Sequence, residues 1–193
     1  MIQINSSNAN VVGKHLRAVH NETGVGIVLQ DYPLISGVRM EISELKKVLA
    51  DNEDIIVAVK SESPPTPPAI FSIVAATSIP IFGGLGGVNL VDEMFAGAAG
   101  AMTGFSFPEA LVATIKAYQT GGYKAARAEF APWLPLVNFE SQAGISLGVR
   151  KECLRMRGLI LESAVRPPAP SMPESLTPLL KEHIAAANQL LRS

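Results

Sequence analysis

The sequence has 193 residues, of which 48% are hydrophobic, and its formal net charge is -1. This length suits one sizeable core or part of a larger domain, and the charge gives no reason to expect nucleic acid or an anionic membrane as a partner. No apolar run is long enough to span a bilayer, and the first residues lack the features of a signal peptide. The single cysteine excludes an internal disulfide and the three histidines form no ligand cluster. We therefore expect a cytoplasmic protein with no metal and no cofactor.

Short apolar runs alternate with helical patterns through the first half of the chain. The strands that these runs predict cover residues 25–29, 55–59, 79–82 and 100–105. The helical patterns cover residues 7–22, 43–49 (with Ser43 as the expected N-cap), 70–75 and 90–96, and a loop is expected at 31–37. This alternation favours parallel strands joined by right-handed crossovers.

The second half of the chain is predicted to be helical. The pattern runs from Pro108 to about residue 158 with a break at 133–135, a proline-rich linker follows at 166–170, and a final amphipathic helix covers 176–191. Four parallel strands suit either an open doubly wound sheet or part of a (β/α)8 barrel. Because a whole barrel needs about 250 residues, a barrel protein of this length is expected to be the last half of one.

Lys60 ends the predicted strand 55–59, which is made of five consecutive apolar residues. Such a run predicts a strand buried on both faces of a parallel sheet. Desolvation of a lysine at its end favours the neutral amine, which is a nucleophile for a carbonyl carbon. The alternative is a lysine that extends to solvent where the strand ends.

Several segments resemble the dihydrodipicolinate synthase / N-acetylneuraminate lyase family, the class I pyruvate-type aldolases and hydro-lyases. These segments are Gln30–Pro33 with Ser36–Gly37, Ile56–Lys60, Phe82–Gly84 and Gly97–Gly104, and in the tail Phe139–Glu140, Lys151, Gly158 and Arg166–Pro167. The resemblance implies an α/β fold of the (β/α)8 TIM-barrel type with only strands five to eight present. Residues 1–107 would then be a partial barrel of four βα units, and residues 108–193 the last barrel helix and a C-terminal helical region.

The resemblance also implies a reaction. Lys60 would form a Schiff base with a pyruvate-like 2-oxo acid, and an aldehyde or sugar acid would be the second reactant or the substrate cleaved or dehydrated. Gln30 stands where the family usually carries a proton-relaying tyrosine, and Ile35 where the synthase has a carboxylate-binding arginine. Lys60 is followed by Ser61–Glu62 rather than by the usual acidic and small pair. These departures argue against dihydrodipicolinate synthesis itself.

Other residues are expected around this lysine as substrate-binding groups. Gln30 and Tyr32 share one side of an extended segment, so Tyr32 either supplies a hydroxyl or packs against Pro33. Gly83 and Gly84 would let the backbone approach a ligand, or would only form a tight turn. Met102 and Thr103 follow the last predicted strand and would line the pocket, although a core role suits Met102 equally.

Two further classes of function stay open from the sequence. One is a non-catalytic half-barrel that acts only by association, and homo-oligomers are expected in either case because exposed sheet edges and apolar faces favour pairing. The inward side chains left without an opposing half would come from Val25, Ile27, Val57, Val59 and Ile81. The other is a small nucleotide binder that uses the glycine turn 83–87, which lacks the G-x-G-x-x-G spacing.

The remaining charged residues and the cysteine are expected to be structural. Glu140, Arg150, Lys151 and Arg157 are predicted to be solvated or interface charges. Cys153, on an apolar helix face, is predicted to be a buried thiol.

Overall fold

The computed structural model describes residues 1–192, which form two compact units. Unit 1 comprises Met1–Gly84 and Asn89–Met102, and unit 2 comprises Leu85–Val88 and the chain from Thr103 onward. The domain boundary expected after residue 107 stays a prediction.

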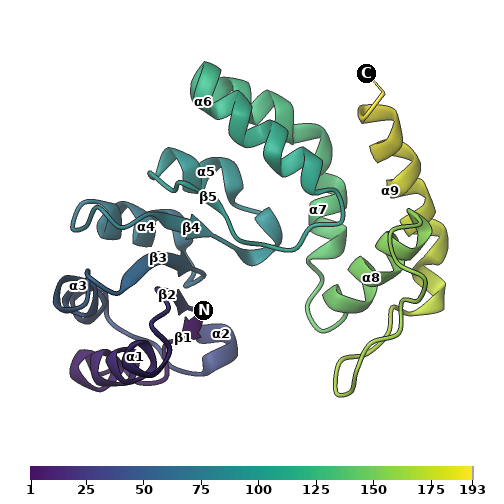
Figure 1. The fold of residues 1–193 in the computed structure, drawn as a ribbon. Helices are drawn as coiled ribbons and strands as arrows, with labels where there is room; N and C mark the ends of the chain where they lie inside the picture. Colours follow the sequence, from purple (N-terminus) through teal and green to yellow (C-terminus); the bar gives the residue numbers. More distant parts are fainter. Residues whose placement is uncertain (193) are drawn as a thin grey trace. The chain divides into compact units, whose positions relative to one another are not determined.

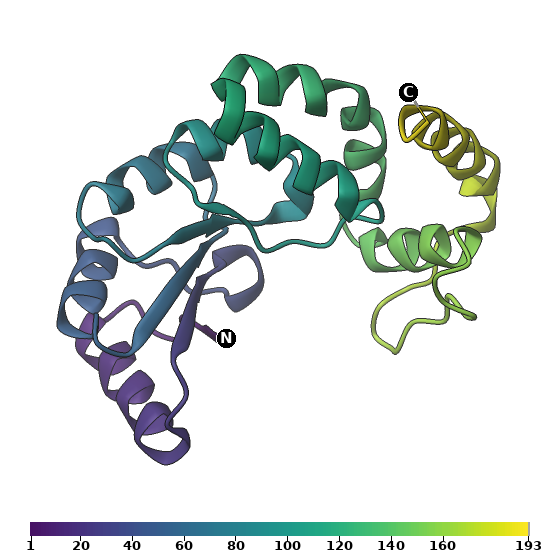
Figure 2. The same cartoon turned by 45° about the horizontal axis from the view of Figure 1, so that its top comes forward.

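Unit 1 contains a parallel sheet, which confirms the expected α/β class with parallel strands. Over residues 1–192 its strands, in spatial as well as chain order, are β1 (Ile2–Gln3), β2 (Ile27–Asp31), β3 (Ile56–Ser61), β4 (Ile81–Gly83) and β5 (Gly100–Ala101). The arrows of β2 and β3 point the same way (Figure 2). Strand β1 lies outside the predicted strands, and β5 is shorter than the strand predicted for residues 100–105.

The helices of unit 1 are α1 (Ala9–Thr23), α2 (Pro33–Ser36), α3 (Ile42–Asp51), α4 (Thr66–Val74) and α5 (Leu90–Phe95) (Figure 1). The short helix α2 lies inside the segment predicted as a loop. The N-cap of α3 is Glu41 rather than Ser43. Helix α4 begins four residues before its predicted start because proline is tolerated in a first helical turn, where no N–H partner is needed.

One face of the sheet carries the core of unit 1. Side chains of Ile27, Leu29, Val59 and Ile81 are almost fully buried and belong to one cluster with apolar residues of α1, α3 and α4. The helices contribute apolar side chains to this cluster: Val12 and Leu16 from α1, Leu45, Val48 and Leu49 from α3, and Ile70 and Ile73 from α4. Burying each such side chain stabilises the fold by roughly 1.5–3 kcal/mol. This burial therefore fixes which face of each strand packs against the helices.

The other face of the sheet is less covered within unit 1. The pairing of β2 with β3 shifts register between Ile27 and Val28, so that Val28 pairs with Ala58 and Val57 has no partner residue on β2. The side chain of Val57 is 55% exposed. The prediction of a strand buried on both faces is therefore wrong at Val57, because this irregularity takes the residue out of the alternation. Among the side chains expected to be inward, Val25 is also exposed, whereas Ile27, Val59 and Ile81 are buried.

Unit 2 is helical in its described part. Its elements are η1 (Leu85–Gly87), α6 (Pro108–Phe130), η2 (Ala131–Trp133), α7 (Leu134–Glu140), α8 (Ser146–Met156), η3 (Glu174–Leu176) and α9 (Thr177–Leu190). Helix α6 is kinked at Gly122, whose φ of 68° requires glycine. Phe105, Phe107 and Trp133 pack their rings together. Within residues 1–192 no helix has the length and apolar character that crossing a membrane requires.

Two predictions about side chains of unit 2 have different outcomes. Cys153 is buried as predicted, and burial raises the pKa of its thiol to about 12. Glu140 was expected to be a solvated or interface charge, which is wrong because it is buried. Its carboxylate accepts a hydrogen bond of 3.1 Å from the backbone N–H of Ser106 and lies 3.7 Å from Arg150 Nε.

Candidate active site

The register of the sheet places Lys60 in a row of residues that runs across all its strands. Gln3 pairs with Gln30, Gln30 with Lys60, Lys60 with Phe82, and Phe82 with Gly100. The row lies near the carboxyl ends of parallel strands, the edge at which α/β enzymes bind their ligands. Gln30 and Lys60, separated by about thirty residues in sequence, are thus neighbours in space.

Lys60 and Gln30 share one partner, the carboxylate of Glu62. Lys60 Nζ lies 3.0 Å from Glu62 Oε2, and Gln30 Nε2 donates a hydrogen bond of 2.6 Å to the same oxygen. The side chains of Lys60 and Glu62 are only 14% and 5% exposed. An ion pair this deeply buried is held by geometry and extra hydrogen bonds, because desolvation offsets much of the charge attraction.

Backbone hydrogen bonding to β2 keeps the chain extended from Lys60 to Glu62. The N–H of Glu62 donates to the carbonyl of Asp31, 2.8 Å away, so the ladder between β2 and β3 continues one residue beyond β3. Side chains two residues apart on an extended chain point to the same face. Lys60 and Glu62 therefore lie on one side of the sheet, where their charged groups meet.

A second buried carboxyl group, that of Glu93, lies on α5. Its Oε1 accepts a hydrogen bond of 2.5 Å from the hydroxyl of Thr66, which in turn accepts one of 3.2 Å from Asn89 Nδ2. Its Oε2 has no hydrogen-bond partner among the described residues. Burial raises the pKa of Glu93 to about 7, and the nearby charge of Glu62 adds to the rise. Near neutral pH this group is thus a carboxylic acid for much of the time.

Gly83 and Gly84 make room for the two carboxyl groups. A Cβ added to Gly83 would overlap Glu93 Oε2, and one added to Gly84 would overlap Glu62 Oε1. The close backbone approach that the sequence analysis assigned to a ligand is made here by two acidic side chains. These glycines bring both carboxyl groups to the end of β4.

The other residues predicted for the site occupy different surroundings. Tyr32 directly follows β2, and its carbonyl accepts a hydrogen bond of 3.3 Å from Gln3 Nε2. The N–H of Met102 donates to the carbonyl of Gly83 at 2.9 Å, so it extends the pairing of β4 with β5. Thr103 belongs to unit 2, where its hydroxyl accepts a hydrogen bond of 2.7 Å from the N–H of Gly86. The substrate-binding roles of all three stay predictions.

Sequence reasoning missed Glu62 and Glu93 as functional candidates. Glu62 had a usable signal, because it stands two residues after Lys60 on an extended segment. Glu93 had none, since its burial depends on the backbone of Gly83 lying against it. Within residues 1–192 no three His, Cys, Asp or Glu side chains are grouped closely enough to hold a metal ion.

The arrangement combines three chemical capacities. The amine of Lys60, when neutral, can attack a carbonyl carbon, and the carboxylate of Glu62, 3.0 Å from Nζ, can accept a proton. Glu93, kept partly protonated by burial, is able to donate one. A buried amine paired with one carboxylate, and a second carboxyl group kept protonated by burial, are the groups that acid–base chemistry requires.

Comparison with known proteins shows what the chain is similar to. The family described as "Dihydrodipicolinate synthetase family" matches residues 5–187. L-2-keto-3-deoxyarabonate dehydratase from Azospirillum brasilense is 29% identical over 167 residues, which cover 84% of this chain and 53% of that protein. The chain therefore spans about half the length of this curated relative.

Solved structures share the fold. Dihydrodipicolinate synthase from Rhodopseudomonas palustris superposes with a TM-score of 0.83 at 30% identity, over 96% of this chain and 62% of that one. A catalytic-lysine mutant of the sialic acid aldolase from Ruminococcus gnavus gives a TM-score of 0.81 at 20% identity, over 95% of this chain and 61% of that one. At that identity the aldolase shows the fold alone.

Replacing Gly84 with alanine tests the packing of Glu62. Gly84→Ala is expected to lower the free energy of unfolding by about 1–3 kcal/mol, because the new methyl group overpacks the site and displaces Glu62 from Lys60. In a Glu62→Ala background, which removes the atoms that the methyl group meets, the same change should cost at least about 0.5 kcal/mol less. Urea unfolding of the four proteins measures this coupling. Equal costs in both backgrounds would show that Gly84 does not confine Glu62.

The pKa of Glu93 predicts how stability depends on pH. Its folded pKa of about 7 lies above its ordinary value of 4.5, so the folded state holds the proton more tightly. The tighter binding of this proton by Glu93 in the folded state stabilises the protein by at most about 3 kcal/mol. This stabilisation is complete below pH 4.5 and is lost as the pH rises through 7. Glu93→Gln should therefore remove most of the fall in stability between pH 6 and 7.

The range from pH 6 to 7 is chosen because a second buried carboxyl group, that of Asp31, changes the stability mainly below pH 6. Burial raises the pKa of Asp31 to about 6, against the opposing charge of Arg39, so its contribution is lost mainly at lower pH. Urea midpoints measured across this range for Glu93→Gln, and for the exposed control Glu53→Gln, make the test. A Glu93→Gln protein with the same slope as the control would contradict the prediction.

Proposed function

Because the chain belongs to the dihydrodipicolinate synthetase family, we propose that it is a lyase that binds a 2-oxo acid as an imine on Lys60 and removes water from a 2-keto-3-deoxy sugar acid. The observation that supports this most is the buried contact of Lys60 Nζ with Glu62, 3.0 Å away. The charge of Glu62 also acts on a second buried carboxyl group, that of Glu93. The dehydratase activity of the Azospirillum relative supports the choice of reaction and substrate class.

Imine formation begins with proton transfer within the buried pair. Lys60 gives a proton to Glu62, and the neutral amine attacks the keto carbon C2 to form a carbinolamine. Glu62 then returns the proton to the carbinolamine hydroxyl, which leaves as water while the C=N bond forms. Gln30, hydrogen-bonded to the same carboxylate oxygen, holds Glu62 in position through both transfers.

Dehydration uses the iminium as an electron sink. The carboxylate of Glu62 takes a proton from C3, and the electron pair of the C–H bond forms an enamine with C2. The enamine then expels the hydroxyl group of C4, which takes a proton from Glu93 and leaves as water. This step requires the Glu93 carboxyl group, whose Oε2 lies against the backbone of Gly83, to reach the C4 hydroxyl at the end of β4. Hydrolysis of the conjugated iminium frees Lys60.

Two substitutions favour dehydration over condensation with a second substrate. Ile35 stands where the synthase carries its carboxylate-binding arginine, and in this chain it is 69% exposed. Gln30 replaces the proton-relaying tyrosine and binds Glu62 instead. We therefore propose a single small-molecule substrate, a 2-oxo sugar acid, rather than the pair of substrates that dihydrodipicolinate synthesis requires.

The sheet is proposed to be part of a (β/α)8 barrel in which β2 to β5 are strands five to eight. The chain covers 62% of the Rhodopseudomonas structure, which leaves room for this assignment. A second candidate function is a non-catalytic half-barrel that acts by association, which the exposed Val57 on the sheet favours. Homo-oligomers would cover the exposed face around Val57 in either case.

Imine trapping tests the proposal. The chain is incubated with pyruvate and borohydride, digested, and its peptides are weighed. A reduced adduct is expected on Lys60, and Lys60→Arg, which keeps the positive charge for Glu62, should abolish it. Lys47→Arg, at an exposed lysine on α3, is the matched control and should label like the unaltered chain.

Loss of water from 2-keto-3-deoxyarabonate is measured with the same protein. Glu62→Gln should lower its rate by about a hundredfold to ten-thousandfold, as expected when a general base is removed. An adduct that maps to another lysine would contradict the mechanism. A folded chain that forms no adduct would favour the non-catalytic function.

A further inference from the structure

The side chain of Glu93 is held by residues at the starts of two helices of unit 1. Thr66 is the first residue of α4, and Asn89 is the N-cap of α5, four residues before Glu93. The N–H of Glu93 donates a hydrogen bond of 2.8 Å to the carbonyl of Asn89, so one helical turn places both residues on the same face of α5. The hydroxyl of Thr66 bonds to both of their side chains, at 2.5 and 3.2 Å. We call these three residues the α4–α5 clamp.

The hydrogen bonds of the clamp run in one direction, toward Glu93. The amide of Asn89 donates to the oxygen of Thr66, and Thr66 donates its single hydroxyl hydrogen to Glu93 Oε1. Within residues 1–192 this is the one hydrogen bond that the fully buried hydroxyl donates. A proton donated from Glu93 to Thr66 would leave that hydroxyl hydrogen buried without an acceptor, which is costly. Oε1 is therefore the acceptor oxygen of the carboxyl group.

The second oxygen of Glu93 has different surroundings. Oε2 is buried and has no hydrogen-bond partner among the described residues. It faces the backbone of Gly83, where an added Cβ atom would overlap it. A neutral carboxyl group has one O–H, and because Oε1 serves as an acceptor, the proton belongs on Oε2. The O–H of Glu93 is thus a buried donor at the end of β4.

We propose that Thr66 and Asn89 are positioning residues, which keep the proton of Glu93 on Oε2 and direct it to the end of β4. The role of this proton in dehydration rests on the proposed function, in which it is given to the leaving hydroxyl group. The clamp also limits how tightly Glu93 holds the proton, because a hydrogen bond donated to Oε1 stabilises the ionised carboxylate. Burial and the clamp thereby act in opposite directions on one acid.

The groups that act on Glu93 are few, so its titration reports on the clamp. Burial is the main cause of its raised pKa of about 7, and the hydrogen bond from Thr66 opposes this rise. The charges of Glu62, after β3, and of Asp92, on α5, raise the pKa further. The neighbouring elements α4 and β4 carry no titratable side chain. Removal of the Thr66 hydroxyl therefore changes one contribution and leaves the others in place.

Thr66→Val, which removes the hydroxyl and nearly keeps the shape, tests the direction of the bond. Urea midpoints are measured from about pH 5 to 9 for the parent and for Thr66→Val, each with and without Glu93→Gln, so that the difference isolates Glu93. In the parent this difference should fall as the pH rises through 7. In Thr66→Val the fall should move upward by about one to two pH units, because the ionised carboxylate loses a hydrogen bond.

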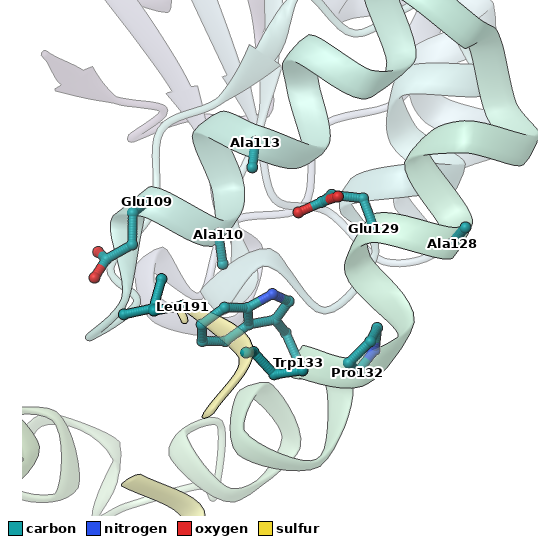
Figure 3. Close-up of a pocket in the computed structure, with 9 residues that line it drawn as sticks. Glu109, Ala110, Ala113, Ala128, Glu129, Pro132, Trp133 and Leu191 are labelled. Carbon is teal, nitrogen blue, oxygen red and sulfur yellow. The ribbon is translucent and has the colours of Figure 1, made fainter. Parts of the chain in front are cut away.

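Matched controls separate this effect from a general loss of packing. Thr66→Ser keeps the hydroxyl and should restore the fall to the pH of the parent. Thr114→Val removes a buried hydroxyl of unit 2, which bonds to the carbonyl of Ala110 at 2.8 Å, and should leave the pH of the fall unchanged. Glu129 is an exposed carboxylate that lines a cavity of about 190 Å³ in unit 2 (Figure 3). Glu129→Gln in place of Glu93→Gln should give a difference without a fall near pH 7.

Asn89→Ala is a second variant, which keeps the test decisive if Thr66→Val does not fold. Its fall should also move upward, by less, because the Thr66 hydroxyl is a weaker donor without the bond from Asn89. A fall that stays at the pH of the parent in the folded variants would overturn the proposal. A downward shift would also overturn it, because it would show that Glu93 donates to Thr66. These measurements need no substrate, so failure of imine trapping on Lys60 would sink the proposed function separately.

Discussion

The position of the Glu62 carboxylate is the constraint on which the rest of the site depends. One of its oxygens accepts from both Lys60 and Gln30, at 3.0 and 2.6 Å, and the side chain is almost fully buried. A buried carboxylate is stable only when its partners compensate for lost water. Here those partners come from two adjacent strands, so the charged site and the register of β2 with β3 stabilise each other.

The same constraint explains the backbone around the site. Glu62 occupies the space that a side chain at Gly84 would need, and Glu93 occupies the space beside Gly83. Burial is the main cause of the raised pKa of Glu93, and the charge of Glu62 adds to it. The proposed base, Glu62, and the proposed acid, Glu93, therefore differ in their surroundings and not in their chemical type.

The parts of the structure that were predictable from sequence depend on local pattern. Apolar runs of the right length located β2, β3 and β4 to within two residues, and the βα alternation gave their parallel order. Lys60 ends such a run, and the structure places it near the carboxyl ends of the parallel strands, as the pattern predicted. By contrast, β1 is only two residues long and has no pattern of its own; it exists because it pairs with β2.

The parts that were not predictable depend on contacts between distant residues. Val57 is exposed because of a local register shift, which no periodicity in the strand reveals. Glu140 looks like a surface charge in sequence and is buried because Ser106 and Arg150 supply partners from elsewhere in unit 2. The pairing of Gln30 with Glu62 likewise needs the sheet to form first. Sequence therefore located the candidate nucleophile, Lys60, whereas the folded chain was needed to find its partner Glu62.

Exchange of substrate hydrogen tests the central claim most directly. Pyruvate incubated with the chain in deuterium oxide should exchange its C3 protons, because Glu62 removes them from the imine on Lys60. Borohydride should still trap pyruvate on the Glu62→Gln protein. The exchange of the pyruvate protons should be slower by a factor of about a hundred or more. Exchange at the original rate in Glu62→Gln, with the imine still forming on Lys60, would contradict the account.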